Sequence, residues 1–313
     1  MRYALPIPVL AIAFLLSGQS LAADIDWAKV DAALGKTASV QGEVHRYGIP
    51  RSDLQVTVDG VTIKPALALG GWLGFEPMAG GALVMGDLVL TEPEIEPVIT
   101  KLLASGIEVT ALHNHLLRAN PATYYMHIHG HGDAVALATA IRAALGESKT
   151  PFGPPAAPAT QAAQIDLDTA ALDSAFGAKG KVNGGVYQFS APRKDEVTEG
   201  DTPVPPAMGT ATVINFQPTG GGKAAITGDF VITAREVNPM IRALRENGIE
   251  VTAIHSHMLD ATTPLLRPLL GQRRCPQASE RLTSGAREDR GHAELMPRPT
   301  LDVDPQPWQE PNS

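Results

Sequence analysis

The sequence predicts an α+β fold of two tandem homologous modules, each a mainly antiparallel sheet packed with helices, with the second module incomplete. The main observation is an internal repeat, in which GIEVTALHNH at residues 106–115 returns as GIEVTAIHSH at residues 248–257, an offset of 142 residues. The same offset relates Gly86-Asp87 to Gly228-Asp229. Repetition at one fixed spacing along most of a chain indicates a duplicated module.

Each module is predicted to contain a short helix, strands, a longer helix, two further strands and a final helix. The short helix spans Ile25 to Gly35, where apolar residues recur at helical spacing, and Leu167 to Gly177 repeats it. The longer helix follows Thr91, which forms a capping box with Glu94. Because Glu94 is duplicated at the same helical position, the sequence favours capping over catalysis for this glutamate.

The next two predicted strands run from Glu108 to His115 and from Tyr124 to Gly130. If they pair as an antiparallel hairpin that turns near Asn120-Pro121, their odd-numbered residues project from one face. This face would carry His113, His115, His127 and His129, with His115 near His127, and His131 extends the set.

Several imidazoles on one patch of sheet are typical of a site for a divalent transition metal, zinc or copper, since neutral imidazole suits these ions. The metal ligands predicted from this pattern are the five histidines His113, His115, His127, His129 and His131. The alternative is a set of hydrogen-bonded, solvent-facing or proton-responsive histidines without a metal. His255 and His257 have no other histidine near them in the sequence, so the second copy suggests a vestige or a fold requirement.

Three other residues are candidates for binding a small ligand: Arg51, Asp53 and Tyr125. A guanidinium recognises carboxylates and phosphates through two parallel hydrogen bonds. Because the Pro-Arg-x-Asp segment recurs at Arg193 and Asp195, a structural Arg–Asp bridge is the favoured interpretation.

The start of the chain predicts export. Residues 1–22 combine an early arginine, an apolar run from Ala4 to Leu16 and a small-residue site between Ala22 and Ala23, which is typical of a cleaved signal peptide. The run is too short to span a membrane. We therefore expect a periplasmic or secreted protein with no transmembrane anchor. A net charge of −8 without a basic run argues against nucleic acid as a partner, which leaves a metal ion, a small molecule or a cell-envelope component.

The predicted domains are a first module at residues 24–150, a Pro/Ala-rich linker at 151–163, a truncated second module at 164–263 and a tail at 264–313. Residues 261–313 contain seven arginines and no lysine, whereas residues 1–260 contain nine of each. With suitable codons from Leu265 onward, a shift of one nucleotide restores CYVRFWANDDA, which matches YYMHIHGHGDA of the first copy. We therefore expect the tail to be an out-of-frame, disordered translation.

The duplicated histidine block, the Pro-Arg-x-Asp-Leu segment and the stretch from Tyr124 to Ala134 resemble the LppY/LpqO family of exported bacterial proteins. This resemblance covers roughly residues 24–260. It implies export and a tandem repeat, but the family domain has no assigned function. Mycobacterial members are lipoproteins, whereas this chain lacks a cysteine near the cleavage site.

Three functions are compatible with the sequence. The first is an exported protein that binds a transition metal or a small ligand through the histidine-rich face of the first module. The second is a zinc-dependent envelope hydrolase, in which three histidines would hold zinc and an open position would activate water. An enzyme needs a positioned acid, and Asp133 is better placed as a helix N-cap. The third is a non-catalytic interaction module.

Overall fold

A computed structural model describes residues 24–152, 165–199, 202–258 and 265–266. The first module forms one six-stranded sheet, and every neighbouring pair of strands in it is antiparallel. Its strand order is β1-β2-β5-β6-β8-β7. The strands are β1 (Ser39–Gln41), β2 (Val44–Pro50), β5 (Gly70–Met78), β6 (Gly81–Thr91), β7 (Glu108–His113) and β8 (Thr123–Gly132). The helices that accompany this sheet are α1 (Trp27–Leu34), α3 (Glu92–Ala104) and α4 (Ala134–Leu145).

The second module repeats this plan with a four-stranded antiparallel sheet of order β14-β13-β10-β9. Its strands are β9 (Lys181–Asn183), β10 (Val186–Pro192), β13 (Ala211–Gly220) and β14 (Lys223–Asp229), and its helices are α5 (Thr169–Phe176) and α6 (Val237–Glu246). Short elements complete the structure: β3 (Thr57–Val58), β4 (Val61–Thr62), α2 (Pro65–Ala68), β11 (Thr198–Glu199), β12 (Thr202–Pro203), η1 (Pro206–Met208), β15 (Ile232–Thr233) and β16 (Leu265–Leu266). The predicted fold class, two helix-packed antiparallel modules with a shorter second copy, is confirmed.

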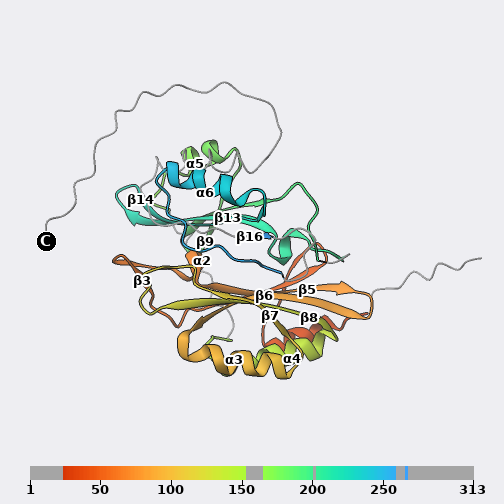
Figure 1. Cartoon of the computed structure of the whole chain (residues 1–313). Helices are drawn as coiled ribbons and strands as arrows, with labels where there is room; N and C mark the ends of the chain where they lie inside the picture. Colours follow the sequence, from red (N-terminus) through yellow and green to blue (C-terminus); the bar gives the residue numbers. More distant parts are fainter. Residues whose placement is uncertain (1–23, 153–164, 200–201, 259–264, 267–313) are drawn as a thin grey trace, which may run out of the picture.

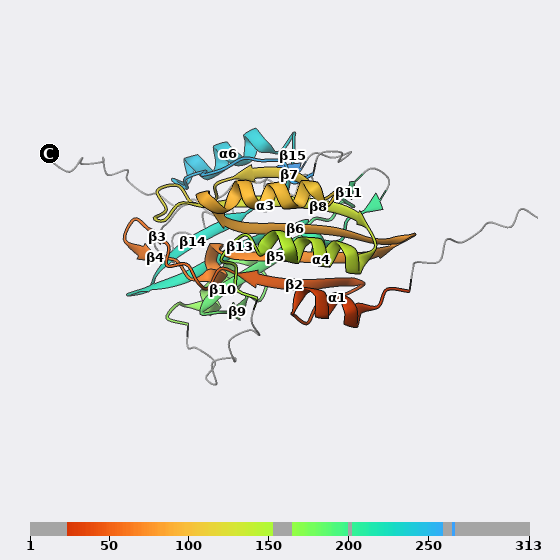
Figure 2. The same cartoon turned by 90° about the horizontal axis from the view of Figure 1, so that it is seen from below.

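The two sheets face each other, and the helices cover their outer faces. Figure 1 shows α3 and α4 below the first sheet and α5 and α6 above the second. Figure 2, seen from below, shows α3 and α4 lying over the first sheet and running along its strands, with α1 beside β2. The molecule is therefore a four-layer sandwich of helices, sheet, sheet and helices. Each sheet has to bury both of its faces, one under its own helices and one against the other module.

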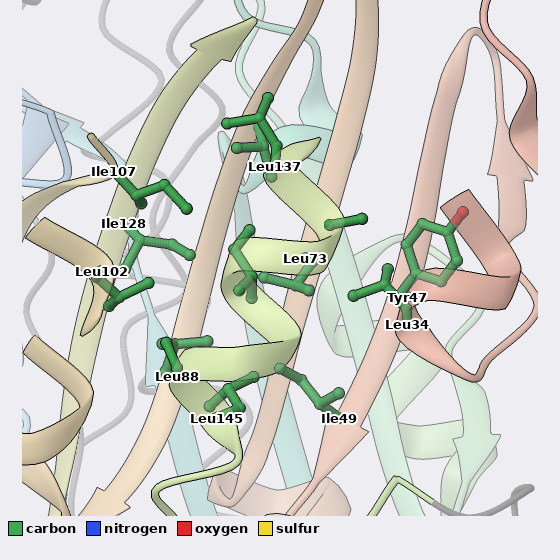
Figure 3. Packing of buried hydrophobic residues seen from close by; sticks show 14 of the residues in the cluster. Leu34, Tyr47, Ile49, Leu73, Leu88, Leu102, Ile107, Ile128, Leu137 and Leu145 are labelled. Carbon is green, nitrogen blue, oxygen red and sulfur yellow. The ribbon is translucent and has the colours of Figure 1, made fainter. Parts of the chain in front are cut away.

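The outer face of the first sheet carries the main hydrophobic core. Even-numbered residues of β6 and β8, such as Leu88 and Ile128, point towards the helices and are almost fully buried. Figure 3 shows Leu137 and Leu145 of α4 among side chains from the strands of this sheet. Burial of one such side chain is worth roughly 1.5–3 kcal/mol, so this core accounts for much of the stability of the first module.

The inner face of the first sheet packs against the second module through apolar residues. Trp72 and Met85 form one buried cluster with Val204, Met208 and Met258 of the second module. A second apolar cluster joins the region around α2 to β10 and β14 of the second module. Odd-numbered residues of β6 and β8 face this interface, because side chains of a strand alternate between the two faces.

The repeat is visible in matching structural details. The short helices end at Gly35 and Gly177, the bounds that the sequence predicted, and both glycines adopt the left-handed conformation. Asp133 accepts a hydrogen bond from the backbone of Ala136 and so caps α4, again as predicted. β15 and β16 pair in the same register as their equivalents in the first copy. Ile232 pairs with Leu266 as Leu90 pairs with Tyr124, and Thr233 pairs with Leu265 as Thr91 pairs with Thr123.

Parts of the sequence-based organisation lie outside the described residues. The predicted signal peptide at 1–22, most of the linker at 151–163 and the tail beyond Leu266 all belong to this group. Strand pairing nevertheless extends to Leu266, inside the segment that the sequence assigns to the out-of-frame tail. Within the described part of the chain, no helix is both long enough and apolar enough to cross a membrane.

One carboxylate of the first sheet gives the fold a distinctive pH dependence. Burial, assisted by the nearby charge of Glu43, raises the pKa of Glu76 on β5 to about 7. A glutamate ordinarily titrates near 4.5, so the folded chain binds the extra proton between pH 4.5 and about 7. The stability contribution is therefore present at low pH and is lost as the pH rises through this window.

We expect Glu76→Gln to remove this dependence, because glutamine stays neutral at every pH. With allowance for the partial exposure of the side chain, the variant should gain about 1 kcal/mol over the wild type at pH 8 and little at pH 5. Urea denaturation at both pH values measures the difference. An equal effect of the substitution at pH 5 and pH 8 would contradict the raised pKa.

Candidate metal centre

Four buried or half-buried histidine side chains meet between the two modules. The possible ligand atoms of His113, His115, His127 and His255 all lie within 4.8 Å of one another. His127 is in the middle, with its Nε2 atom 2.9 Å from Nε2 of His113 and 3.1 Å from Nε2 of His255. We call these four residues the histidine centre.

The hairpin of the first module supplies three of the four side chains. β7 and β8 pair antiparallel, as the sequence predicted, with an irregularity between Val109 and Ala111. Beyond this irregularity, Ala111 lies opposite His127 and His113 lies opposite Tyr125. His113 therefore makes the ring contact with His127 that the sequence assigned to His115, while His115 stacks on Tyr125 with ring centroids 3.6 Å apart.

The fourth side chain comes from the other copy of the repeat. His255 lies on the segment after α6 and is the repeat equivalent of His113. The two rings stack with centroids 3.5 Å apart. The interpretation of the second-copy histidines as a vestige or a fold requirement missed this contact, because the sequence places no other histidine near them. The two copies fold face to face, so residues 142 apart in sequence become neighbours.

Two hydrogen bonds from threonine side chains to backbone carbonyls hold the two copies in this position. The hydroxyl of Thr110 donates to the carbonyl oxygen of His257, and the hydroxyl of Thr252 donates to the carbonyl oxygen of His115. These two hydrogen bonds are repeat equivalents of each other. The two histidine-bearing segments therefore contact each other with approximate two-fold symmetry.

The geometry of the histidine centre suits a small transition-metal ion. A tetrahedral zinc ion with bonds of about 2.0–2.1 Å needs ligand nitrogens about 3.3–3.4 Å apart. The closest nitrogen pairs, at 2.9 and 3.1 Å, lie just below this separation. Small rotations of the rings would produce the required distances. The donor set is entirely imidazole, which favours zinc, copper or nickel over magnesium or calcium.

Further buried polar groups surround the histidine centre. His257 lies beside His127, with ring centroids 4.2 Å apart, and is 2% exposed. Tyr125 is buried behind His115, and burial together with the charge of Asp87 raises its pKa. Tyr125, a predicted ligand-binding residue, therefore contacts the centre through its ring, where it supports His115.

Asp87 lies next to the central histidine, near the outer limit of an ion-pair distance. Its Oδ1 atom lies 3.9 Å from Nδ1 of His127, the ring nitrogen opposite the one that faces His113 and His255. A carboxylate at the far nitrogen of a metal-binding histidine fixes the ring orientation and makes the nitrogen a stronger donor. Asp87 on β6 is 6% exposed and is repeated as Asp229 in the second copy.

We expect Asp87→Asn to weaken zinc binding about 10-fold, at the lower end of the range for outer-shell partners of metal ligands. The measurement is competition for zinc with a chelator of known affinity. Glu108→Gln is the control, because Glu108 is an exposed carboxylate that contacts His129 rather than the histidine centre. Equal affinities of the two variants would count against an orienting role for Asp87.

Two of the five predicted metal ligands lie outside the histidine centre. His129 is buried further along β8 and contacts Glu199 through Nε2 at 2.7 Å and Glu108 through Nδ1 at 3.4 Å. Burial lowers the pKa of His129, but the hydrogen bonds and charges of Glu199 and Glu108 outweigh burial and raise it. His131 is exposed and packs edge-on against His129. His129 thus joins β8 to β11 of the second module.

Arg51 and Asp53, the other predicted ligand-binding residues, form the Arg–Asp bridge that the sequence favoured. Arg51 is fully buried and donates to Asp53, to both carboxylate oxygens of Glu94 and to the carbonyl oxygen of Val89. The guanidinium is therefore occupied by internal partners, and its burial does not fit binding of an external ligand. Arg193 repeats these contacts with Asp195, Glu236 and Val231.

Comparison with known proteins identifies a family but no activity. The family model described as Domain of Unknown Function (DUF1259) matches residues 28–147 and 170–266. No curated protein matches. Among solved structures, the chain is similar to a trimeric bacterial microcompartment shell protein, PduB, with 15% identity over 80% of this chain and 89% of that chain. The TM-score of 0.20 is too low to support any conclusion about fold or function. The two matched segments cover more than half of the chain, one in each module, so the chain belongs to the family described as Domain of Unknown Function (DUF1259).

Proposed function

We propose that this chain binds a divalent transition metal, zinc or copper, at the histidine centre between its two modules. The observation that carries the proposal is the convergence of four imidazoles within 4.8 Å of one another. His115, His127 and His255 are 8% exposed or less, and apolar residues of both modules enclose the region. Neutral imidazole nitrogens held together in this way are stronger metal ligands than exposed histidines spread over a sheet.

A binding role is better supported than hydrolysis. An enzyme of the zinc-hydrolase type needs an acidic residue positioned to activate the bound water. Asp133 caps α4 instead, and Asp87 faces the far nitrogen of His127. Asp133 is therefore engaged in capping, and Asp87 lies on the side of His127 away from His113 and His255.

We further propose that the chain is an exported member of the LppY/LpqO group, with a periplasmic or secreted location and a cell-envelope component as a partner. The signal-peptide pattern of residues 1–22 and the resemblance of the duplicated histidine block support this proposal. Export would place the histidine centre where metal ions are exchanged with the surroundings of the cell. Mass spectrometry of the protein secreted or released from the periplasm tests it by locating the new N-terminus at Ala23.

Calorimetry on the full mature chain, purified without a histidine tag and stripped of metal, tests metal binding. We expect one zinc or copper ion per chain with micromolar or tighter affinity and no binding of magnesium, which prefers oxygen ligands. Copper or zinc analysis of the protein as isolated provides a second measurement. Absence of micromolar zinc and copper binding would reject the proposal.

A further inference from the structure

We propose that metal occupancy of the histidine centre acts as a clamp that locks the second module onto the first. This inference rests on the proposed function, because it adds a structural consequence to metal binding at the same site. Three of the four proposed ligands belong to the β7–β8 hairpin region of the first module, and the fourth, His255, belongs to the second. Only the docked arrangement of the modules brings all four together.

The docked arrangement also contains contacts that need no metal. Arg118 of the first module lies at the exposed rim and forms ion pairs with Asp59 of its own module and Glu250 of the second. The backbone of Lys64 donates to the side chain of Gln217, and the side chain of Gln217 donates to the carbonyl oxygen of Thr62. Together with the two apolar clusters, these contacts dock the modules without metal, and the histidine centre adds a metal-dependent part.

The second module depends on this docking more than the first. Its described sheet has four strands where the first has six, and β16 covers only Leu265 and Leu266 where β8 is ten residues long. The segment that carries His255 contacts the first module at several points: His127 contacts its ring, Thr110 donates to the carbonyl oxygen of His257, and Met258 packs with Trp72 and Met85. Loss of docking would therefore release this segment.

A ligand that binds only the docked state suppresses opening in proportion to its concentration. At a free zinc concentration 100 times the dissociation constant, the equilibrium constant for opening falls about 100-fold. The first module keeps its own core under α3 and α4. The effect should therefore be concentrated in residues 237–258 and be small in α4.

Hydrogen exchange measured by mass spectrometry on the full mature chain, with and without zinc, tests the clamp. We expect zinc to slow exchange of peptides from residues 237–258 by up to 100-fold, while peptides from α4 change little. Calorimetry on the same sample establishes that zinc is bound. Bound zinc with unchanged exchange in residues 237–258 would overturn the clamp and leave metal binding intact, whereas absence of zinc binding would overturn the proposed function itself.

The repeat offers a matched pair of variants that separates a clamp from general stabilisation by a ligand. His113→Ala removes a ligand from the first module but leaves ligands on both modules, whereas His255→Ala leaves ligands on the first module alone. Hydrogen exchange of each variant is measured at a zinc concentration high enough to saturate that variant. We expect zinc to protect residues 237–258 in His113→Ala and to leave them unprotected in His255→Ala.

Arg118→Met provides the control for contacts that do not involve metal. It removes the ion pairs at the rim and should speed exchange of residues 237–258 by the same factor with and without zinc. Each variant is compared with its own zinc-free form, because loss of the ring contact between His113 and His255 affects both variants with or without metal. Equal zinc protection in the His113→Ala and His255→Ala variants would overturn the clamp.

Discussion

Replacement of His127 with alanine is expected to lower zinc affinity about 100- to 1,000-fold. Structural zinc sites with four ligands bind with about 10–16 kcal/mol, so one ligand is worth about 2.5–4 kcal/mol, and each 1.4 kcal/mol is tenfold in affinity. His127 should be at least as important as any other ligand, because it lies within 3.1 Å of both His113 and His255 through the same nitrogen atom.

His129→Ala is the matched control for this variant. His129 lies two residues further along β8, is similarly buried and projects from the same face, but it contacts Glu199 and Glu108. We expect His129→Ala to lower the stability of the protein and to leave zinc affinity close to that of the wild type. Calorimetric titration of both variants measures the contrast. Equal losses of affinity would mean that the metal binds elsewhere on this strand.

The second large effect concerns the buried ion pair between Arg51 and Glu94. Arg51→Met leaves the Glu94 carboxylate buried without its guanidinium partner, and removal of one member of a buried pair costs about 3–5 kcal/mol. The side chains of Arg51 and Glu94 are 1% and 8% exposed. Urea denaturation followed by tryptophan fluorescence measures the loss. Two of the three tryptophans, Trp27 and Trp72, lie in the first module, and Trp72 also packs against the second.

Arg193→Met tests the same contact in the second module. Glu236 is 24% exposed and Asp195 is 78% exposed, so water replaces part of the lost interaction. We expect a clearly smaller loss in unfolding free energy for Arg193→Met, measured by exchange of peptides from residues 237–246. A loss equal to that of Arg51→Met would show that burial does not control the strength of this pair.

The effect of Arg51→Met should also depend on pH. Burial raises the pKa of Glu94, but hydrogen bonds from Arg51 and from the backbones of Thr91 and Lys149 outweigh burial and lower it below its ordinary value of 4.5. The ion pair therefore contributes stability above pH 4.5, and this contribution is lost as the pH falls through the lowered pKa. We expect the difference between wild type and Arg51→Met to be largest near neutral pH and to shrink below pH 4.

Several features of the fold could be predicted from the sequence because they depend on short segments. The capping box of Thr91 and Glu94 is present, with the backbone of Thr91 donating to Glu94. The hairpin of β7 and β8 is antiparallel, and the short helices end at Gly35 and Gly177. Local periodicity and capping chemistry are sufficient for these features, since each involves residues close in the chain.

For Glu94, the sequence predicts the local contact but not the distant one. The sequence identifies its capping role, but Arg51 is 43 residues away and its partnership with Glu94 is set by the packing of α3 against the end of β6. The repeat did contain a signal, since Arg51 and Glu94 are duplicated together as Arg193 and Glu236 at the same offset. Duplication shows that two positions are kept, but not that they touch.

The histidine centre, too, could be predicted from the sequence only in part. The sequence by itself determined that there are two copies of one module, that each carries a His-x-His segment, and that one face of the β7–β8 hairpin is rich in histidine. Only the tertiary structure decided that His255 lies with His113, His115 and His127, and that His129 lies outside this group, in contact with Glu199. Strand periodicity predicts which face of a sheet a side chain occupies, but not which other part of the protein packs against that face. The second module packs there because burial of the apolar residues around Trp72 and Met208 excludes water between the two copies.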